Sequence, residues 1–372
     1  MRYYIIAGEA SGDLHGSGLV HALRAQDSSA EIRAWGGDRM EAAGATIVKH
    51  YRDLAFMGFV EVLKHLRTIL RNIAFCKADI QQYQPDVLVL IDYPGFNLRI
   101  AKWARAQGLR VVYYISPQVW AWKEGRVRGI KTAVHRMLVI LPFEVDFYRK
   151  WDYAVDYVGH PLAEFIAAEQ AKPLPPGEHQ KPILALLPGS RKMELAQKLP
   201  VMLRAAAHFP DCRIVVAGAP SMPAAEYAPY LQGTSAELWE NKTYELLRQA
   251  RAALVTSGTA TLETALFGVP QVVCYRGNPI SFWLAKRLVK VKWISLVNLI
   301  MDRSVVPELI QHDLTEANIV AHLRPLLTAG PEHDKMVADY AELQSRLQEG
   351  GASAKAAAIV IEEARKHAAG KQ

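Results

Sequence analysis

Two short segments in the second half of the chain carry glycine and hydroxyl residues in an order suited to phosphate binding. They are Leu187–Arg191 (LPGSR) and Thr256–Glu263 (TSGTATLE), and each follows an apolar run typical of a buried strand. A glycine turn between a strand and a helix exposes backbone N–H groups at the positive end of the helix dipole, which favours an anion. Two such turns in one domain predict a ligand with a diphosphate group.

The side chains of these segments suit a nucleotide. The planar guanidinium of Arg191 matches phosphate oxygens, and Glu263 is placed to reach a ribose. Chain reversal alone would also explain glycine and serine at either turn, but two turns with an arginine and an acid favour a nucleotide diphosphate. The residues assigned to its binding are Gly189, Ser190, Arg191, Ser257, Gly258, Thr259 and Glu263.

An acidic residue follows a strong apolar run in the first half of the chain. The run Asp86–Ile91 ends at Asp92, and Tyr93-Pro94-Gly95 comes next. A carboxylate at the carboxyl end of a central parallel strand points toward the edge where ligands bind. We interpret Asp92 as a general base, a role that typically contributes about 10²–10⁴ in rate. The alternative is that Asp92 caps the helix that starts near Phe96.

The first apolar run leads into a different kind of turn. The sequence AGEASGDLHG at 7–16 is not GxGxxG and carries acids where a pyrophosphate would want none, so no dinucleotide site is expected there. Two glycines would let a second substrate approach the backbone. Ser11 or Asp13 would cap the following helix. We assign to the acceptor substrate Gly8, Glu9, Ser11, Gly12 and Asp13.

Apolar side chains adjoin cations in three segments, 57–71, 120–131 and 282–290. Such a pattern is typical of a surface that docks on anionic lipid, although most amphipathic helices simply bury their apolar stripe against a sheet. The residues assigned to membrane or acyl-chain contact are Met57, Phe59, Trp120, Trp122 and Trp283.

Length and composition bound the class of protein. The 372 residues exceed one ordinary core, and 51% hydrophobic with 22% charged residues is typical of globular proteins. Three scattered cysteines favour neither disulfides nor a structural zinc site.

A strand that begins at Arg2 leaves no room for a signal peptide. The expected location is cytoplasmic, and the net charge of +7 predicts a phosphorylated substrate and an anionic membrane surface rather than nucleic acid.

Strand-like runs alternate with helical patterns, which predicts an α/β protein with two doubly wound parallel sheets. The runs are Arg2–Ala7, Asp86–Ile91, Arg110–Ile115, Met137–Leu141 and Val155–Val158, then Ile183–Leu187, Arg213–Ala217, Ala252–Thr256 and Gln271–Tyr275. The predicted domains are 1–170 and 183–350, joined by a proline-rich linker at 171–182. The final helix, 351–372, would pack on the first domain or on a second subunit of a homodimer.

Taken together, these segments resemble the lipid-A-disaccharide synthases, membrane-associated glycosyltransferases that build the lipid A backbone in bacteria with an outer membrane. The resemblance runs through nearly the whole chain. Its motifs stand in the same order: AGEASGD (7–13), MGFVEVL (57–63), IDYPGFN (91–97), SPQVWAWK (116–123), LPFE (141–144), VGHPL (158–162), LPGSR (187–191), TSGTATLE (256–263), FWLAKRLVK (282–290) and SLVN (295–298). Val297 departs from the family pattern, which usually has proline before the asparagine.

The resemblance implies a GT-B fold, in which two Rossmann-like domains face a central cleft, and an inverting transfer without metal or other cofactor. The donor would be UDP-2,3-diacylglucosamine and the acceptor 2,3-diacylglucosamine 1-phosphate, giving a β(1→6) disaccharide 1-phosphate and UDP. Asp92 would take the proton from the acceptor 6-hydroxyl, with Glu9 or Asp13 as the alternative base. Arg191 would stabilise the leaving UDP, and Asn298 would line the donor site. The enzyme would associate peripherally with the inner membrane.

Two other functions stay open on the sequence. Another GT-B enzyme acting on UDP-sugars, such as a 2-epimerase, would share the nucleotide-binding half. A non-catalytic nucleotide sensor or membrane scaffold would bind UDP without turnover.

Overall fold

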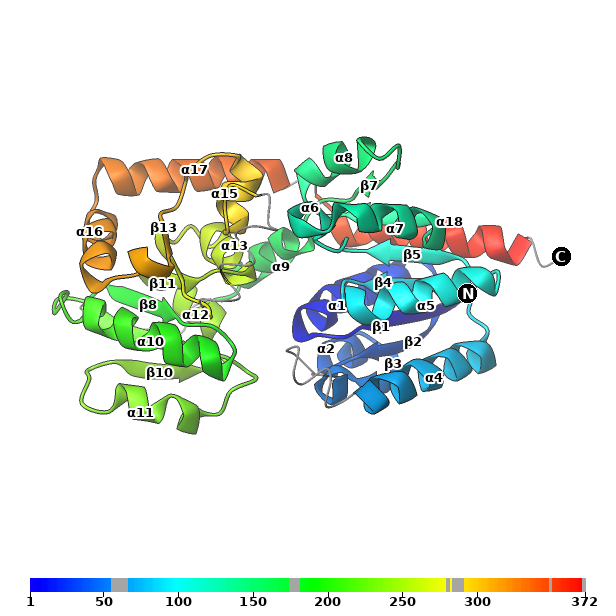
Figure 1. Ribbon diagram of the computed structural model, residues 1–372, viewed down its shortest axis with the longest axis horizontal. Coiled ribbons are helices and arrows are strands. Elements are labelled where there is room, and N and C mark those ends of the chain that lie inside the picture. The colour runs from blue at the N-terminus through cyan, green and yellow to red at the C-terminus, as the bar shows by residue number, and fades with distance from the viewer. Residues whose placement is uncertain (55–65, 174–180, 279–281, 283–290, 348–349, 370–372) are drawn as a thin grey trace. The chain divides into compact units, whose positions relative to one another are not determined.

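The chain folds into two compact units. The structure, a computed structural model, describes residues 1–54, 66–173, 181–278, 282, 291–347 and 350–369 (Figure 1). The first unit comprises Met1–Pro161 and Glu349–Gln372, and the second comprises Leu162–Gln348. The sequence-based boundaries instead placed 162–170 in the first domain. No helix within the described residues is long and apolar enough to cross a membrane.

In the described part of the first unit, seven parallel strands form one sheet in the order β3-β2-β1-β4-β5-β6-β7. The strands are β1 (Arg2–Ala7), β2 (Glu31–Gly36), β3 (Thr46–His50), β4 (Val87–Ile91), β5 (Val111–Tyr114), β6 (Arg136–Val139) and β7 (Asp156–Tyr157). All residues of β4 are fully buried, because helices cover both faces of the sheet.

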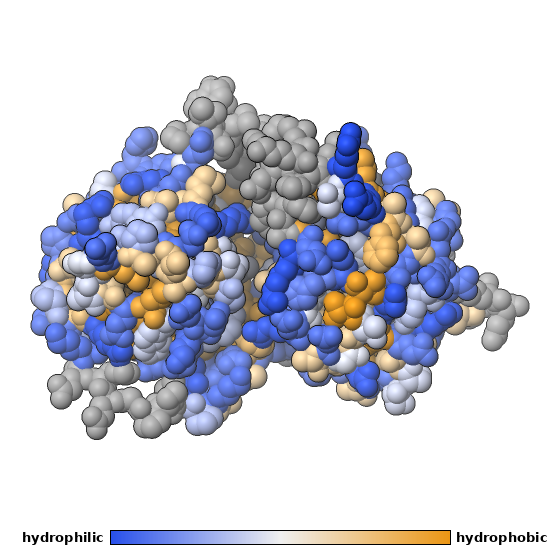
Figure 2. Space-filling model, turned by 90° about the horizontal axis from the view of Figure 1, so that it is seen from below, coloured by the Kyte–Doolittle hydropathy of each residue, from blue (hydrophilic) through white to orange (hydrophobic). Residues whose placement is uncertain are grey.

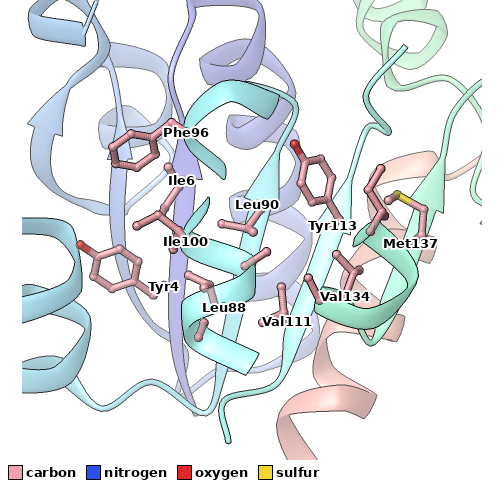
Figure 3. Close-up of a cluster of buried hydrophobic side chains, with 14 of the residues drawn as sticks. Tyr4, Ile6, Leu88, Leu90, Phe96, Ile100, Val111, Tyr113, Val134 and Met137 are labelled. Carbon is pink, nitrogen blue, oxygen red and sulfur yellow. The ribbon is translucent and has the colours of Figure 1, made fainter. Parts of the chain in front are cut away.

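Alternate side chains of these strands face two helical layers. Tyr4 and Ile6 of β1 belong to the core cluster that includes Phe96 and Ile100 of α5 (Figure 3). On the other face, α1 and α18 pack together and α18 contacts β4. The helices are α1 (Ala10–Gln26), α2 (Asp38–Ala42), η1 (Tyr51–Leu54), α4 (Leu66–Tyr83), α5 (Pro94–Ala106), α6 (Val119–Trp122), η2 (Glu124–Arg126), α7 (Val127–Ala133), α8 (Pro142–Arg149) and α18 (Ala352–Ala369).

The second unit repeats the architecture. Its described residues form a parallel sheet of six strands in the order β10-β9-β8-β11-β12-β13. The strands are β8 (Ile183–Leu187), β9 (Arg213–Gly218), β10 (Glu237–Glu240), β11 (Ala250–Thr256), β12 (Gln271–Tyr275) and β13 (Glu308–Ile310). The helices are α9 (Pro161–Gln170), α10 (Lys192–Ala206), η3 (Ala224–Glu226), α11 (Ala228–Leu231), α12 (Thr243–Leu247), α13 (Thr259–Leu266), α15 (Leu296–Met301), η4 (Gln311–Asp313), α16 (Glu316–Leu327) and α17 (Pro331–Leu347).

The strand order of each sheet reverses direction at one place. In the first sheet this switch lies between β1 and β4, where Ala7 pairs with Ile91. In the second it lies between β8 and β11, where Leu187 pairs with Val255. Open parallel sheets bind ligands beyond the carboxyl ends of the strands at such switch points. The segments singled out from the sequence begin at these four strand ends, and the predicted α/β class with two doubly wound sheets is confirmed.

Candidate functional site

Asp92 stands directly after β4 on a strained backbone. Its φ is +42° and that of Tyr93 is +48°, so two consecutive non-glycine residues adopt the left-handed region. The Asp92 carbonyl accepts hydrogen bonds from the hydroxyl of Tyr113 (2.6 Å) and from Nδ2 of the buried Asn97 (2.8 Å). These bonds hold the turn. Capping of α5 by Asp92 is wrong as an interpretation, because the N-cap residue is Tyr93.

The Asp92 carboxyl group has a proton affinity suited to a base at neutral pH. Burial first and the Glu9 carboxylate second raise its pKa to about 7, against the opposite effect of a hydrogen bond from the Tyr93 backbone. A group with a pKa near the working pH is ionised often enough to accept a proton and still binds that proton firmly. Strain, burial and a like charge on one residue are typical of a functional site.

The turn after β1 is held together by contacts within the chain. A side chain at Gly8 would lie 2.3 Å from the ring of Tyr93, and one at Gly12 would lie 3.1 Å from Cβ of Ala7. Tyr93 and Ala7 thus make close contacts that only glycine allows at these two positions, while acceptor binding by this turn stays a prediction. Ser11 lies half-buried in the first turn of α1.

Asp13 caps a helix, but not the one that contains it. The N-cap residue of α1 is Glu9, so the expected cap of α1 by Ser11 or Asp13 is wrong. The buried Asp13 carboxylate instead accepts hydrogen bonds from three backbone amides at the start of α2: Gly37 (2.7 Å), Met40 (3.1 Å) and Arg39 (3.1 Å). Both carboxylate oxygens of Asp13 are used in these bonds. Glu9 is the acid of this turn whose charge raises the pKa of Asp92.

Sequence reasoning missed a second buried carboxyl group. Glu144 is 1% exposed and accepts hydrogen bonds from Ser116 Oγ (2.7 Å), Trp120 Nε1 (3.3 Å) and the Leu141 amide (3.0 Å). Burial outweighs these donors, which lower the pKa, and leaves the pKa of Glu144 raised to about 7. The signal was present in LPFE, since a glutamate in the first turn of a helix often returns to the backbone before it. This network fixes the loop after β5.

The tryptophans of that loop have different environments. Trp120 is 8% exposed and meets the ring of Phe143 edge-on at 4.9 Å, so it packs inside the first unit and does not lie on its surface. Trp122 is 47% exposed, with the Lys123 ammonium 3.9 Å from the centre of its ring. The other residues assigned to membrane or acyl contact lie outside the described residues: Met57, Phe59 and Trp283.

In the second unit, both glycine turns have the expected backbone. Gly189 (φ +114°) and Gly258 (φ +147°) adopt conformations that favour glycine, and a side chain at Gly258 would meet nothing within 4 Å. Gly258 is the N-cap of α13, and Arg191 is the N-cap of α10. Neither residue caps its helix with a side chain; α10 carries Glu194 in its first turn, and the first turn of α13 carries no acid.

The polar side chains of the two turns differ in their contacts and exposure. Arg191 is 59% exposed, with Nη1 3.7 Å from Glu194, whose other oxygen accepts the Ser190 amide at 3.1 Å. Ser257 is tied by its hydroxyl to the Ile294 carbonyl (3.0 Å). Thr259 is exposed at the start of α13.

Glu263 lies on α13, one helical turn after Thr259. Its Oε1 accepts a hydrogen bond from the hydroxyl of Tyr244 (2.8 Å), and burial raises its pKa while this bond lowers it. The Tyr244 ring packs between Phe165 and Phe267, with centroid distances of 5.5 Å to each. The carboxyl group is therefore held in one orientation, as recognition of a ribose would need.

Both polar atoms of the Asn298 side-chain amide form hydrogen bonds within the protein. Oδ1 accepts from the amides of Val305 (2.7 Å) and Val306 (2.9 Å), and Nδ2 donates to Glu308 Oε1 (2.9 Å) and to the Val306 carbonyl (2.9 Å). The structure thus gives Asn298 a positioning role in the loop before β13. Val297 is the second residue of α15, where an N–H has no partner within the helix, so valine serves as well as proline there.

Within the described residues, no cluster of three or more His, Cys, Asp or Glu side chains is arranged to hold a metal ion. The first unit carries two carboxyl-bearing turns at the carboxyl ends of β1 and β4, and the second carries two glycine turns and a cation at the carboxyl ends of β8 and β11.

Solved structures with the same fold include glycosyltransferases and epimerases. The calicheamicin glycosyltransferase CalG4 matches with a TM-score of 0.61 and 17% identity, over 98% of both chains. The UDP-GlcNAc 2-epimerase of Neisseria meningitidis, solved with UDP-GlcNAc, matches with a TM-score of 0.63 and 11% identity, over 98% of this chain and 100% of that chain. Identities this low show the fold alone, which is the predicted GT-B fold.

The sequence comparisons are more specific. A family model described as lipid-A-disaccharide synthetase matches residues 3–361. The lipid-A-disaccharide synthase of Trichlorobacter lovleyi is 39% identical over 370 residues, and that of Myxococcus xanthus is 40% identical over 371, each covering 97% of both chains. These matches do not favour the 2-epimerase alternative. The chain belongs to the lipid-A-disaccharide synthase family of glycosyltransferases.

Proposed function

We propose that the chain transfers 2,3-diacylglucosamine from UDP to the 6-hydroxyl of 2,3-diacylglucosamine 1-phosphate. The products would be the β(1→6) disaccharide 1-phosphate and UDP. Family membership supports the reaction class. The observation that carries the mechanism is Asp92, a carboxyl group on a strained turn with a pKa of about 7 at the switch point of its sheet.

Asp92 would act as the general base. As O6 of the acceptor attacks C1 of the donor sugar, its proton passes to the Asp92 carboxylate, the O6–C1 bond forms and the bond from C1 to the UDP oxygen breaks. Attack from the face opposite UDP inverts the anomeric centre. The bonds from Tyr113 and Asn97 to the Asp92 carbonyl would keep the carboxylate in place, so that the transfer needs little reorganisation.

The second unit would bind UDP and stabilise the charge that develops on it. Arg191 and the N-terminal ends of α10 and α13 offer positive potential to the diphosphate. Glu263, held by Tyr244, would accept hydrogen bonds from the ribose hydroxyls. The negative charge that develops on the leaving UDP would thus be stabilised by groups of the protein.

The experiment is UDP release by the purified protein from UDP-2,3-diacylglucosamine, with and without diacylglucosamine 1-phosphate. Release that depends on the acceptor, with a tetra-acyl disaccharide phosphate as product, is the expected result. A 2-epimerase would change the donor without needing the acceptor, and a nucleotide sensor would bind UDP without turnover. Either outcome contradicts the proposal.

Replacing Glu9 with glutamine should shift the pH dependence of the reaction. The Glu9 carboxylate raises the pKa of Asp92, so its removal lowers that pKa and Asp92 stays ionised to lower pH. We expect the acid limb of the kcat/KM profile to move to lower pH in Glu9→Gln. The Glu41→Gln variant, an exposed residue of α2, should keep the wild-type profile. An unmoved limb in Glu9→Gln would contradict the coupling.

We also propose that the first unit docks on an anionic membrane surface. The exposed Trp122 adjoins the exposed cations Lys123 and Arg126. On α4, Leu70 is 54% exposed between Arg67 and Arg71. Figure 2 shows apolar patches among hydrophilic side chains on one face of the molecule. An aromatic side chain beside cations suits the headgroup region of a bilayer.

Replacing Lys123 and Arg126 together with alanine should weaken binding to vesicles that contain acidic lipid. Each cation contributes about 1 kcal/mol near such a surface, so the pair amounts to about a tenfold or greater loss in partitioning. Flotation with acidic and neutral vesicles, at low and high salt, measures it. The double variant Lys192→Ala/Arg204→Ala removes two exposed cations of α10 and should float like the wild type. Equal binding to both vesicle types would contradict docking.

A further inference from the structure

A buried lysine lies beneath the two glycine turns of the second unit. Lys198 on α10 is 2% exposed, and its ammonium donates a hydrogen bond to Oγ1 of Thr256. Among the described residues, no carboxylate lies within ion-pair distance of this ammonium. A buried charge whose hydrogen-bond partner is a neutral hydroxyl is costly unless another group compensates it.

The position of Lys198 in the fold relates it to both turns. It lies in the second turn of α10, which begins directly after Arg191, and helical side chains lean toward the N-terminus of their helix. Its partner Thr256 is the last residue of β11 and precedes Ser257 and Gly258. The ammonium thus lies where the carboxyl end of β11 meets the start of α10.

The charges around Lys198 do not offset its burial. Burial lowers the pKa of Lys198, and Arg191 lowers it as well, while Glu194 and the Cys274 thiol act in the opposite direction. Burial raises the pKa of Cys274 to about 12, so this thiol is neutral at pH 7. Glu194 directs one oxygen to the Ser190 amide and the other toward Arg191. Glu194 is thus shared between Arg191, the Ser190 amide and the field at Lys198, and the direct partner of the ammonium is the hydroxyl of Thr256.

We propose that Lys198 is a binding residue for the diphosphate of the nucleotide sugar, and supplies positive charge beneath it from the side of Thr256. This inference rests on the proposed function and adds a residue to its donor site. The phosphate would bring negative charge next to an ammonium whose hydrogen-bond partner in the free protein is a neutral hydroxyl. Thr256 would hold the ammonium toward the turn, and the open space at Gly258 would admit the ligand.

The test compares the binding of UDP and of uridine by calorimetry. Lys198→Met keeps the length of the side chain and removes the charge, and Lys198→Gln keeps a donor for Thr256 without the charge. We expect both variants to bind UDP about tenfold or more weakly, because charged hydrogen bonds contribute about 1.5–3 kcal/mol, and to bind uridine as the wild type does. Arg204→Met, which removes an exposed cation of the same helix, should bind both ligands normally.

The pH dependence gives a second measurement. Because the charged lysine binds phosphate, the ratio of UDP to uridine affinity should fall as pH rises through the lowered pKa of Lys198, and this fall should vanish in Lys198→Met. Normal UDP affinity in Lys198→Gln, or equal losses for UDP and uridine, would overturn the inference and leave Lys198 a structural residue. A wild-type protein that binds neither ligand would contradict the proposed function itself, and the inference with it.

Discussion

Replacing Asp92 with asparagine will leave a folded protein that has lost about 10²–10⁴ of its kcat, the usual contribution of a positioned general base. Asparagine has nearly the shape of aspartate and tolerates the left-handed φ of +42° at this position. The backbone bonds from Tyr113 and Asn97 do not involve the side chain of residue 92, so they remain. Steady-state release of UDP in the presence of acceptor measures the loss.

The same substitution should stabilise the fold at neutral pH. The pKa of Asp92 is raised to about 7 in the folded protein, above its ordinary value of 3.8. Between these values the unfolded chain ionises first, so the wild type loses stability as pH rises through this window. Asp92→Asn does not pay that cost. Its melting temperature should equal that of the wild type near pH 4 and exceed it at pH 8.

Asp86 offers the matched control, because it precedes the same strand at its opposite end. Its Oδ2 accepts the Arg2 amide at 2.8 Å, so Asp86→Asn alters an acid directly before β4, remote from the strand's carboxyl end. Turnover of Asp86→Asn should stay near the wild-type value. Near-normal turnover in Asp92→Asn would exclude this residue as the base. Glu9 would then be the next candidate, since Asp13 uses both oxygens to cap α2.

The central strands were predictable because burial on both faces leaves a plain signal in the sequence. β1 and β8 occupy the predicted residues Arg2–Ala7 and Ile183–Leu187. Among the described strands, β2, β3, β10 and β13 were missed. β2 lies inside its sheet but carries the charged residues Glu31 and Arg33, whereas the other three lie at sheet edges and are largely half-buried. An edge strand needs one apolar face and tolerates charge on the other, so its short pattern does not differ from that of a loop.

The candidate site was predictable where a residue's role depends on its neighbours along the chain. Gly258 is an example, since glycine between a strand and a helix is a local signal. Roles that depend on distant partners were not predictable. Asp13 caps a helix that begins 25 residues later, and Glu144 meets Ser116 from a different element. Asn298 was predicted to line a ligand site, yet its amide is occupied by residues up to ten positions away.

Replacing Arg191 with alanine should lower kcat by about 10²–10³, the usual effect of removing one donor to a developing charge. Arg191 is 59% exposed and its contact with Glu194 is 3.7 Å long, so its loss should change the free energy of unfolding by less than about 1 kcal/mol. Lysine at this position keeps the charge but not the planar fork, and should restore only part of the rate. Steady-state kinetics measures the loss of kcat, and thermal unfolding measures the change in stability.

The adjacent Lys192 shows whether the guanidinium of Arg191 or the general charge of the region matters. Lys192 is 73% exposed and pairs with Glu226, so Lys192→Met removes one positive charge next to the same helix end. We expect its kcat to stay near the wild-type value. If Arg191→Ala and Lys192→Met lost rate equally, the general positive charge at the start of α10 would account for the effect. Arg191 would then have no special contact with UDP. If Arg191→Ala raised KM without lowering kcat, the arginine would bind donor and transition state alike, and stabilisation of the leaving group would fall to the helix ends and Lys198.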